Sequence, residues 1–330
     1  MQSEMKILII RLSSLGDIVL TQPVVKILRQ VYPNAKIDFF IKEQFVDLVQ
    51  AFGDADNILV WENEIRRDFK NLLKLRKNYD IVIDLHSKLN TFIIKKILQA
   101  PKTVTYQKKH LLRLAIIKKI TKKKIDSTVE LYFSALAKLG IKTELIFPEL
   151  FVREKYDFKL GNSKKILIFP GALHRTKMYP PEQFSRFIDS VPAKWNCKFI
   201  VAGSENEKEI CDKLVSLTKS EIINLCGKLS VSELLAVINS ADVVISNDSG
   251  PMHIAAALKK PQIAIFGATH PALGFAPLNQ KAVVLAANIP CQPCSLHGTE
   301  KCPKQHFKCM KMISPDMLKK NLNILLQNNF

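Results

Sequence analysis

A lone carboxylate lies where an early strand gives way to a helix, in KILIIRLSSLGDIVL (residues 6–20). After the apolar run, the loop contains Ser13, Ser14, Gly16 and Asp17. A carboxylate in such a loop can act as a general base, taking the proton from an attacking hydroxyl, if it is correctly placed. Asp17 could equally cap the next helix, whose dipole favours a negative charge. The loop matches neither a G-x-G-x-x-G dinucleotide loop nor a P-loop.

A second polar cluster follows an apolar strand in VVISNDSGPMHIAAAL (residues 243–258). Its candidate binding residues are Asp248, Ser249, Gly250 and His253. Backbone N–H groups at a helix start bind anions, and a serine hydroxyl can add a contact. Taken singly, Asp248 could be an N-cap and His253 an interior histidine. Their combination at one strand end favours a diphosphate site.

Two further strand ends carry charged candidates. Lys177 lies in the loop of ILIFPGALHRTKMYPPEQF (residues 166–184), just before a helix start marked by two prolines. A lysine there can meet a phosphate as a point charge, or can simply be exposed. Glu205 follows the strand end VAGS, where a carboxylate could hold ribose hydroxyls or merely begin a helix.

Four of the seven cysteines cluster near the end of the chain: Cys291, Cys294, Cys302 and Cys309. Four thiolates could hold a structural zinc ion, although only the first pair has C-x-x-C spacing. Reduced structural thiols and redox use are the alternatives. A disulfide framework is not indicated, and no partner base suggests a cysteine nucleophile.

The elements that position these residues alternate between strand and helix. In the first half, we expect strands at residues 6–12, 36–42, 57–61, 80–86 and 103–106. In the second half, we expect them at residues 166–172, 198–204, 222–225, 242–248, 261–267 and 282–286. Continuous apolar strands between helices indicate parallel sheets covered on both faces. Ligands of such sheets bind beyond the carboxyl ends of the strands, where the candidates lie.

The best linker candidate is the mixed stretch of residues 141–163. We therefore expect one Rossmann-like domain over residues 1–155 and a second over 156–313. Residues 126–139 read as a helix that stops at Gly140. A final helix within residues 314–330 could pack back on the first domain.

Composition sets the broad class. The 330 residues are 47% hydrophobic, enough for two domains, and no apolar tract approaches the length of a membrane span. No signal peptide is visible, so we expect a cytoplasmic protein. The net charge is +19, and residues 88–125 hold twelve Lys or Arg and no Asp or Glu. This span suits a polyanion such as an anionic membrane, a phosphorylated glycolipid or nucleic acid, or is a solvated surface.

The motifs in this order resemble the bacterial lipopolysaccharide heptosyltransferases of glycosyltransferase family 9. The resemblance rests on RLSSLGDIVLTQP, the PGA…K…P segment around Lys177, SNDSGPMHIAAA, and the Cys-rich tail ending in HFKCM. It covers most of the chain. It implies a GT-B fold, in which two Rossmann-like domains face each other across a cleft.

The resemblance also implies an inverting transfer of heptose from ADP-heptose to the lipopolysaccharide inner core, without a cofactor or obligatory metal. Asp17 matches the catalytic base, within an acceptor loop of Ser13, Ser14 and Gly16. The donor residues would be Lys177, Asp248, Ser249, Gly250, His253 and Glu205. Where some members carry adjacent Thr or Ser before the lysine, this chain has residues 172–176, and Arg175 or Thr176 could take that role.

We expect a monomer at the inner face of the inner membrane, held by the basic span. A GT-B transferase that uses another nucleotide sugar is the alternative. A nucleic-acid-binding protein is a weaker one, because no aromatic platform accompanies the lysines.

Overall fold

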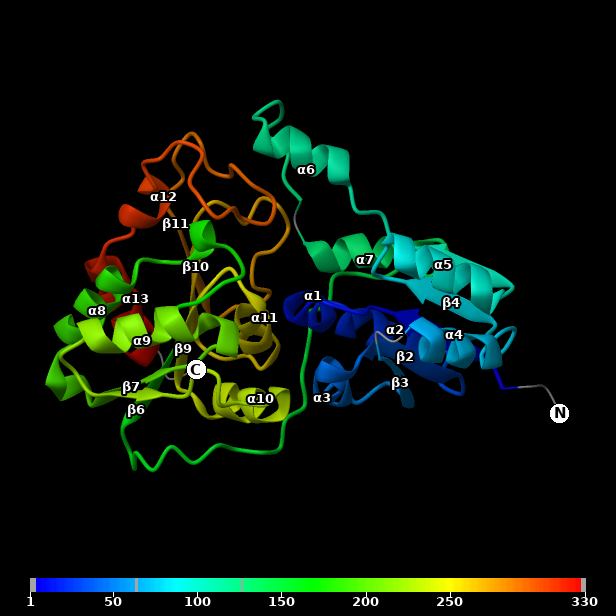
Figure 1. The fold of residues 1–330 in the computed structure, drawn as a ribbon, viewed down its shortest axis with the longest axis horizontal. Helices are drawn as coiled ribbons and strands as arrows, with labels where there is room; N and C mark the ends of the chain where they lie inside the picture. The colour runs from blue at the N-terminus through cyan, green and yellow to red at the C-terminus, as the bar shows by residue number, and fades with distance from the viewer. Residues whose placement is uncertain (1–3, 63–64, 126, 328–330) are drawn as a thin grey trace. The chain divides into compact units, whose positions relative to one another are not determined.

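The structure is a computed structural model that describes residues 4–62, 65–125 and 127–327. Contacts divide the chain into two compact units, coloured along the chain in Figure 1. The first unit comprises Met1–Lys109 and Thr128–Phe151, and the second comprises His110–Ser127 and Val152–Phe330. The main division thus falls after residue 151, near the expected linker. Residues 110–127 belong to the second unit, so the basic span 88–125, expected wholly in the first half, is divided between the two.

The first unit is built on a parallel five-stranded sheet of order β3-β2-β1-β4-β5. Its strands are β1 (Lys6–Ile10), β2 (Lys36–Lys42), β3 (Asn57–Trp61), β4 (Ile81–Asp84) and β5 (Lys102–Thr105). All five expected strands are confirmed: β2 and β3 have the expected bounds, β1 and β4 are shorter, and β5 begins and ends one residue earlier. Side chains on both faces of β1 are buried, because helices cover the two sides of a parallel sheet.

The helices of the first unit are α1 (Leu15–Val19), α2 (Gln22–Val31), the 3₁₀ turn η1 (Glu43–Phe45), α3 (Val46–Gln50), α4 (Ile65–Lys74), α5 (Leu89–Leu98) and α7 (Thr128–Ala137). Helix α7 lies inside the expected range of residues 126–139, of which residue 126 is outside the described residues. The chain leaves this helix through Gly140, whose φ of +84° suits glycine. The predicted helix stop is therefore confirmed.

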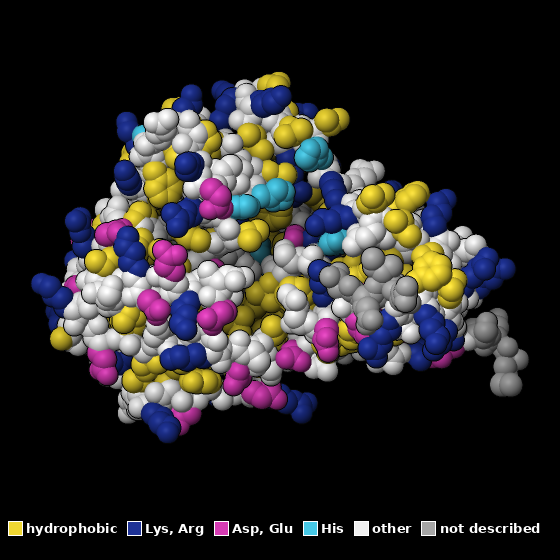
Figure 2. All heavy atoms as spheres, viewed as in Figure 1, with side chains coloured by type: hydrophobic (Ala, Val, Ile, Leu, Met, Phe, Trp, Pro, Cys, Tyr) yellow, Lys and Arg dark blue, Asp and Glu magenta, His cyan; other side chains and the backbone are white. Residues whose placement is uncertain are grey.

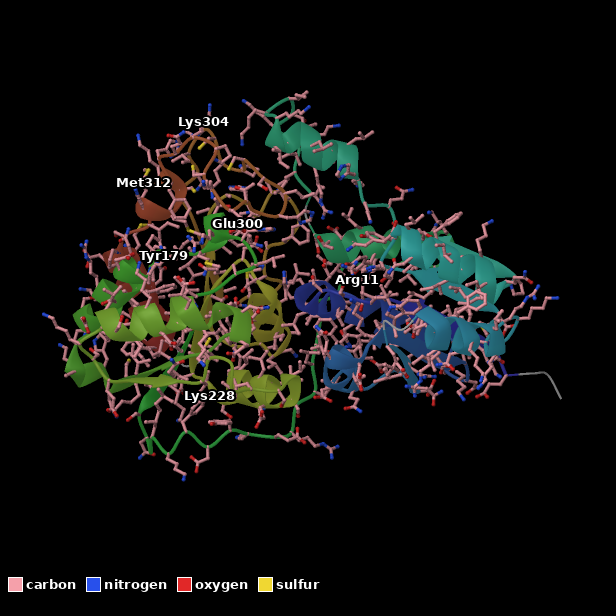
Figure 3. The ribbon with its side chains drawn as sticks, in the orientation of Figure 1. Arg11, Tyr179, Lys228, Glu300, Lys304 and Met312 are labelled. Atoms are coloured by element: carbon pink, nitrogen blue, oxygen red, sulfur yellow. The ribbon has the colours of Figure 1, made fainter. Side chains whose placement is uncertain are left out.

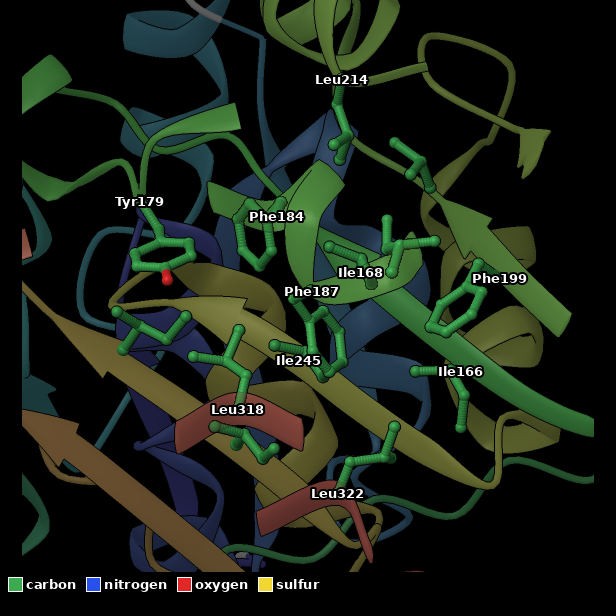
Figure 4. Packing of buried hydrophobic residues seen from close by; sticks show 14 of the residues in the cluster. Ile166, Ile168, Tyr179, Phe184, Phe187, Phe199, Leu214, Ile245, Leu318 and Leu322 are labelled. Atoms are coloured by element: carbon green, nitrogen blue, oxygen red, sulfur yellow. The ribbon is translucent and has the colours of Figure 1, made fainter. Parts of the chain in front are cut away.

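The second unit holds a parallel six-stranded sheet of order β11-β10-β9-β6-β7-β8. Its strands are β6 (Lys164–Phe169), β7 (Cys197–Val201), β8 (Ile222–Asn224), β9 (Val243–Asn247), β10 (Gln262–Phe266) and β11 (Ala282–Ala286). All six expected strands are present. Their side chains pack with helices in one large apolar core, part of which is shown in Figure 4.

The helices of the second unit are α6 (His110–Ile117), η2 (Arg175–Lys177), α8 (Pro181–Ser190), η3 (Ala193–Trp195), η4 (Glu205–Glu207), α9 (Lys208–Leu217), α10 (Val231–Ser240), α11 (Gly250–Ala257), α12 (Lys308–Lys311) and α13 (Pro315–Gln327). Helix α10 matches the expected stretch of residues 230–241.

The last helix, α13, packs within the second unit. Its Leu318, Leu322 and Leu325 lie on one face and are buried in the core of that unit. Figure 4 shows Leu318 and Leu322 in the same core as Ile245 of β9. This differs from the expectation that the helix packs back on the first domain, because its apolar face is already used.

Long-range contacts attach residues 110–127 to the second unit. Arg113 Nε donates to the Leu273 carbonyl at 3.2 Å, and its guanidinium lies 4.7 Å from the centre of the Phe275 ring. The Ile125 amide donates to the Ala272 carbonyl at 2.9 Å. Both ends of the segment are therefore fixed by the chain that follows β10.

Candidate active-site residues in the two units

The Asp17 side chain contacts Arg11, the residue that directly follows strand β1. Asp17 is the third residue of α1, which follows the N-cap residue Ser14. The Ser14 hydroxyl donates to Asp17 Oδ2 at 2.7 Å, and Arg11 Nη2 lies 2.6 Å from the same oxygen. The Asp17 side chain is 27% exposed, so solvent or a substrate can still reach it. The structure brings Ser14 and Asp17 together; Ser13 precedes the N-cap, and Gly16 is the second residue of α1.

Arg11 is the functional candidate that the sequence reasoning missed. It lies in the chain between β1 and α1 and is labelled in Figure 3. It is buried, and Nη1 donates to the Leu85 carbonyl beyond β4. Burial alone would lower the pKa of Arg11, but the nearby Tyr132 and Asp17 outweigh it and the pKa is raised. The guanidinium therefore stays charged and fixes the Asp17 carboxylate.

Three loops of the second unit converge at Asp248. Lys177, which follows β6, places Nζ 3.0 Å from Asp248 Oδ2. Thr269, which follows β10, donates its hydroxyl to the same oxygen at 2.7 Å. The strands β10, β9 and β6 are adjacent in the sheet, so their carboxyl ends meet there. The sequence predicted Lys177 and Asp248 at strand ends, and the structure pairs them.

Asn247 joins two of these loops from within. It is fully buried, and its Nδ2 donates to the Pro170 and Gly171 carbonyls at 2.8 and 3.2 Å. Its Oδ1 accepts from the Tyr179 amide at 3.0 Å. The loop after β6 is therefore fixed to the end of β9 by one amide side chain, which preorganises both. The motif of residues 243–258 contains Asn247, but the sequence pattern assigned no role to it.

Helix α11 begins where these loops meet. Ser249 is its N-cap residue and Gly250 its first residue, so the first-turn N–H groups lie next to Asp248. His253 is in the first turn and is 5% exposed. Together with Lys177, this helix start can stabilise an anion such as a diphosphate.

Glu205 and Glu207 adjoin different loops: Glu205 lies beside Gly227, after β8, and Glu207 beside Gly171, after β6. The Glu205 side chain is 71% exposed, with Lys208 Nζ 3.7 Å from Oε1. Glu207 Oε2 instead accepts from the Ser204 amide and hydroxyl at 2.7 and 2.8 Å, forming a capping box. A Cβ built on Gly171 would lie 2.3 Å from Glu207 Oε1. Glu207 therefore adjoins the β6 loop, and the S-x-x-E spacing was the signal that could have found it.

The segment that follows the first cysteine pair braces the Lys177 loop. Thr176 is buried, and its hydroxyl donates to the Thr299 carbonyl and accepts from the Thr299 amide, both at 2.7 Å. Gly298, at φ +93°, leaves room for the Lys177 stem, since a Cβ there would lie 2.9 Å from Lys177 Cγ. The Thr176 hydroxyl is therefore bonded to Thr299. Arg175 is exposed, so of these two residues it is the more accessible one for the phosphate-binding role expected of a Thr or Ser before Lys177.

The four late cysteines are free thiols. Cys291 Sγ lies 3.9 Å from His306 Nε2, and burial raises the pKa of Cys309 to about 11. Among the residues that the structure describes, no group of three or more His, Cys, Asp or Glu is arranged to hold a metal ion.

Known proteins resemble this chain in sequence and in structure. Residues 66–305 match the family model "Glycosyltransferase family 9 (heptosyltransferase)". The chain belongs to glycosyltransferase family 9. The resemblance inferred from the motifs is thus confirmed, and the protein is a glycosyltransferase.

Relatives and solved structures extend the comparison over almost the whole chain. The chain is 28% identical to lipooligosaccharide heptosyltransferase 2 of Campylobacter jejuni serotype O:2, covering 98% of this chain and 99% of that protein. It is 30% identical to lipopolysaccharide heptosyltransferase 3 of Escherichia coli K12, covering 77% and 80%. E. coli ADP-heptose LPS heptosyltransferase II superposes with a TM-score of 0.76 at 22% identity, covering 98% of both chains. E. coli heptosyltransferase WaaC with ADP gives 0.72 at 20% identity, covering 97% of this chain and all of that one. The predicted GT-B fold is confirmed.

Proposed function

We propose that this glycosyltransferase moves a heptose from ADP-heptose to the inner core of lipopolysaccharide, with inversion. The observation that carries the proposal is the convergence of Lys177, Asp248 and the start of α11 at one sheet edge. This is the chemistry that a nucleoside diphosphate requires. Relatives named as heptosyltransferases and a solved relative that binds ADP support the choice of donor.

In the proposed mechanism, Asp17 takes the proton from an acceptor hydroxyl. The hydroxyl oxygen forms a bond to the anomeric carbon as the bond from that carbon to the diphosphate breaks. The electron pair of the broken bond leaves with ADP, whose growing negative charge Lys177, the α11 amides and His253 stabilise. Arg11 and Ser14 hold the Asp17 carboxylate in place, and placement is the first requirement of a general base.

The test is mass spectrometry of products from the purified protein, a panel of ADP-, UDP- and GDP-sugars, and deacylated core acceptors. We expect one heptose to be added from ADP-heptose and no transfer from UDP- or GDP-sugars. Transfer of another sugar from another nucleotide would replace this proposal by the alternative transferase.

Asp17→Asn tests the role of the carboxylate. We expect turnover to fall by about 10²–10⁴-fold, the usual effect of a general base. The rise in melting temperature on adding ADP should be unchanged, because Asp17 belongs to the first unit and the donor residues to the second. Asp47→Asn, in α3 of the same unit, is the matched control. Equal loss of turnover and of ADP binding would instead indicate a folding role.

We further propose that the enzyme works as a monomer on the cytoplasmic side of the inner membrane, as a peripheral protein. Across the described part of the chain, no helix is both long and apolar enough to cross a bilayer.

Helices α4 and α5 of the first unit offer a surface for peripheral attachment, which we call the α4–α5 apolar face. Its members are 45% to 77% exposed and comprise Phe69, Leu73, Leu89, Phe92 and Ile93. Lys70, Lys74, Lys88 and Lys96 are exposed on the same helices and their caps. Among the described side chains of α4 and α5, the one carboxylate, Asp68, is buried. Figure 2 shows hydrophobic side chains among Lys and Arg on this part of the molecule. Apolar groups ringed by cations favour an anionic lipid surface.

A further inference from the structure

The four late cysteines form a cluster in the second unit, to which the proposed function gives no role. All four are free thiols, and Cys291 Sγ lies 3.9 Å from His306 Nε2. Burial, followed by the charges of Cys294, Cys302 and Cys291, raises the pKa of Cys309 to about 11. Each of these sulfurs therefore lies within electrostatic reach of Cys309.

Cys302 is set apart by the groups that surround its sulfur. Burial alone would raise the pKa of Cys302, but backbone hydrogen bonds outweigh it and the pKa is lowered. These bonds come from the amides of four consecutive residues, Lys304, Gln305, His306 and Phe307. The Gln305 amide also donates to the Cys302 carbonyl at 2.9 Å, and Lys304 is labelled in Figure 3. Amides directed at one sulfur stabilise the thiolate, which is the reactive form of cysteine.

The Cys302 side chain is also accessible. It is partly exposed, in a loop whose next residues, Pro303 and Lys304, are exposed. Cys309, in contrast, is buried in the apolar core. Cys197 of β7 is partly exposed as well, yet burial raises its pKa to about 11. Exposure and thiolate stabilisation thus coincide at Cys302, so an oxidant from solution should react there first.

Cys294 supplies a second thiol near Cys302. Burial, followed by the charges of its C-x-x-C partner and of Cys302, raises the pKa of Cys294, and the charge of Lys119 opposes that rise. Lys119 Nζ donates to the Gln292 and Pro293 carbonyls at 2.6 and 3.0 Å, so the cation lies at the C-x-x-C turn. A nearby cation favours the thiolate that a nucleophilic attack requires.

The chain between these two cysteines braces the Lys177 loop of the donor site. Thr299 accepts from and donates to the Thr176 hydroxyl, and a Cβ on Gly298 would meet the Lys177 stem. A disulfide holds its two sulfurs at about 2.05 Å, so forming one here would draw both ends of this segment together. The bracing contacts would shift, and Lys177 with them.

We propose that Cys302 is a site of reversible oxidation by hydrogen peroxide, that Cys294 converts the product to a disulfide, and that this bond weakens nucleotide binding at Lys177. The oxidation itself is independent of the proposed function. Its effect on the donor site rests on that function, because it requires Lys177 to contact the donor phosphates.

The chemistry needs the oxidant and the two thiols. The Cys302 thiolate attacks one oxygen of the peroxide, the O–O bond breaks, and the other oxygen leaves as hydroxide and takes a proton to become water. The resulting sulfenic acid is attacked at sulfur by Cys294, and its hydroxyl leaves with the Cys294 proton as water. The two thiols have then given two electrons to the peroxide. A dithiol returns two electrons and restores both, and the stabilised Cys302 thiolate is a good leaving group in that step.

The experiment treats the reduced full-length protein with one equivalent of hydrogen peroxide and maps the cysteine peptides by mass spectrometry. We expect wild type to lose two hydrogen atoms in a peptide that joins Cys294 to Cys302. Cys294→Ser should stop at the Cys302 sulfenic acid, which dimedone traps. Cys302→Ser should form neither product. Cys197→Ser, which changes another partly exposed thiol of the second unit, is the matched control and should behave as wild type.

Calorimetric titration with ADP then tests the connection to the donor site. We expect oxidised wild type to bind ADP about 10-fold more weakly than the reduced protein, which corresponds to one hydrogen bond to a charged group. Dithiothreitol should restore the affinity. Reduced Cys302→Ser should bind ADP as wild type does, which shows that it is folded, and peroxide should leave that affinity unchanged.

Three results would overturn the proposal. The first is oxidation of Cys197 or Cys291 before Cys302. The second is a disulfide that leaves ADP affinity unchanged. The third is one zinc or iron ion per purified chain, released when Cys302 is blocked, because the sulfurs would then be metal ligands. If the enzyme transfers no heptose, but the disulfide forms and weakens ADP binding, the proposed transfer fails and the oxidation site stands.

Discussion

The ion pair between Lys177 and Asp248 allows a quantitative test of the donor site. Lys177→Met removes the charge and keeps most of the side-chain length. In the structure, Nζ is 3.0 Å from Asp248 Oδ2, and the two side chains are only 15% and 7% exposed. The substitution therefore leaves a nearly buried carboxylate without its cation.

The expected loss of stability follows from what Asp248 retains. Removing one partner of a fully buried pair costs about 3–5 kcal/mol. Asp248 keeps the hydrogen bond from the Thr269 hydroxyl at 2.7 Å, so we expect about 2 kcal/mol. With an unfolding entropy of about 2.1 cal/mol/K per residue in a unit of roughly 200 residues, the melting temperature should fall by about 5 °C.

The assay is thermal unfolding with and without ADP. If Lys177 also contacts the donor phosphates, the variant should need about 10- to 100-fold more ADP for the same rise in melting temperature. Lys219→Met, an exposed lysine of the second unit, is the control. The double variant Lys177→Met/Asp248→Asn should be less destabilised than the sum of its single variants, because the stranded charge is gone.

Two results would refute this reasoning. An unchanged melting temperature in Lys177→Met, with strictly additive single and double variants, would mean that the ion pair contributes nothing. Unchanged ADP affinity would mean that Lys177 does not contact the donor phosphates, even if its ion pair with Asp248 stabilises the fold.

Three further predictions concern other parts of the molecule. Because the pKa of His86 is about 4 in the fold and about 6.5 unfolded, the unfolded state binds more protons between those values, and stability should fall by about 3 kcal/mol as pH drops from 7 to 4. His86→Gln should flatten this dependence in urea titrations, and an unchanged slope would contradict the assignment. Gly298→Ala should lower stability by about 1–3 kcal/mol and weaken ADP binding in calorimetry, because its Cβ would displace the Lys177 stem. Phe92→Ser with Ile93→Ser should reduce sedimentation with anionic vesicles about 10-fold or more without changing ADP binding, and equal sedimentation would exclude this face.

The strands were predictable because their apolar runs are continuous, as expected when both faces of a parallel sheet are buried. The positions of Asp17, Lys177 and Asp248 at strand ends followed from that pattern. Their partners did not. The Arg11 side chain lies beside the loop after β4, and Thr269 meets Asp248 only because β10 and β9 are neighbours. The contact of Thr269 with Asp248 has no local sequence signal, whereas Arg11 lies in the same short motif as Asp17 but was not singled out.

Other differences also arise from contacts distant in sequence. Glu205 was singled out because it follows a strand end, and Glu207 was not considered, yet the capping box turns Glu207 toward the β6 loop. Residues 110–127 read as part of the first half, since they continue its basic run. Their attachment through Arg113 to the chain after β10 depends on residues about 160 positions away, which periodicity cannot reveal.

The chain passes between its two units three times, after residues 109, 127 and 151. A protease that cuts once near residue 151 would therefore yield two incomplete fragments. The amino-terminal fragment would carry away residues 110–127, of which Arg113 and Ile125 bond to the region after β10. Expressing the second unit alone, or exchanging it with that of a relative, would accordingly require a circular permutation or a graft of two separate stretches.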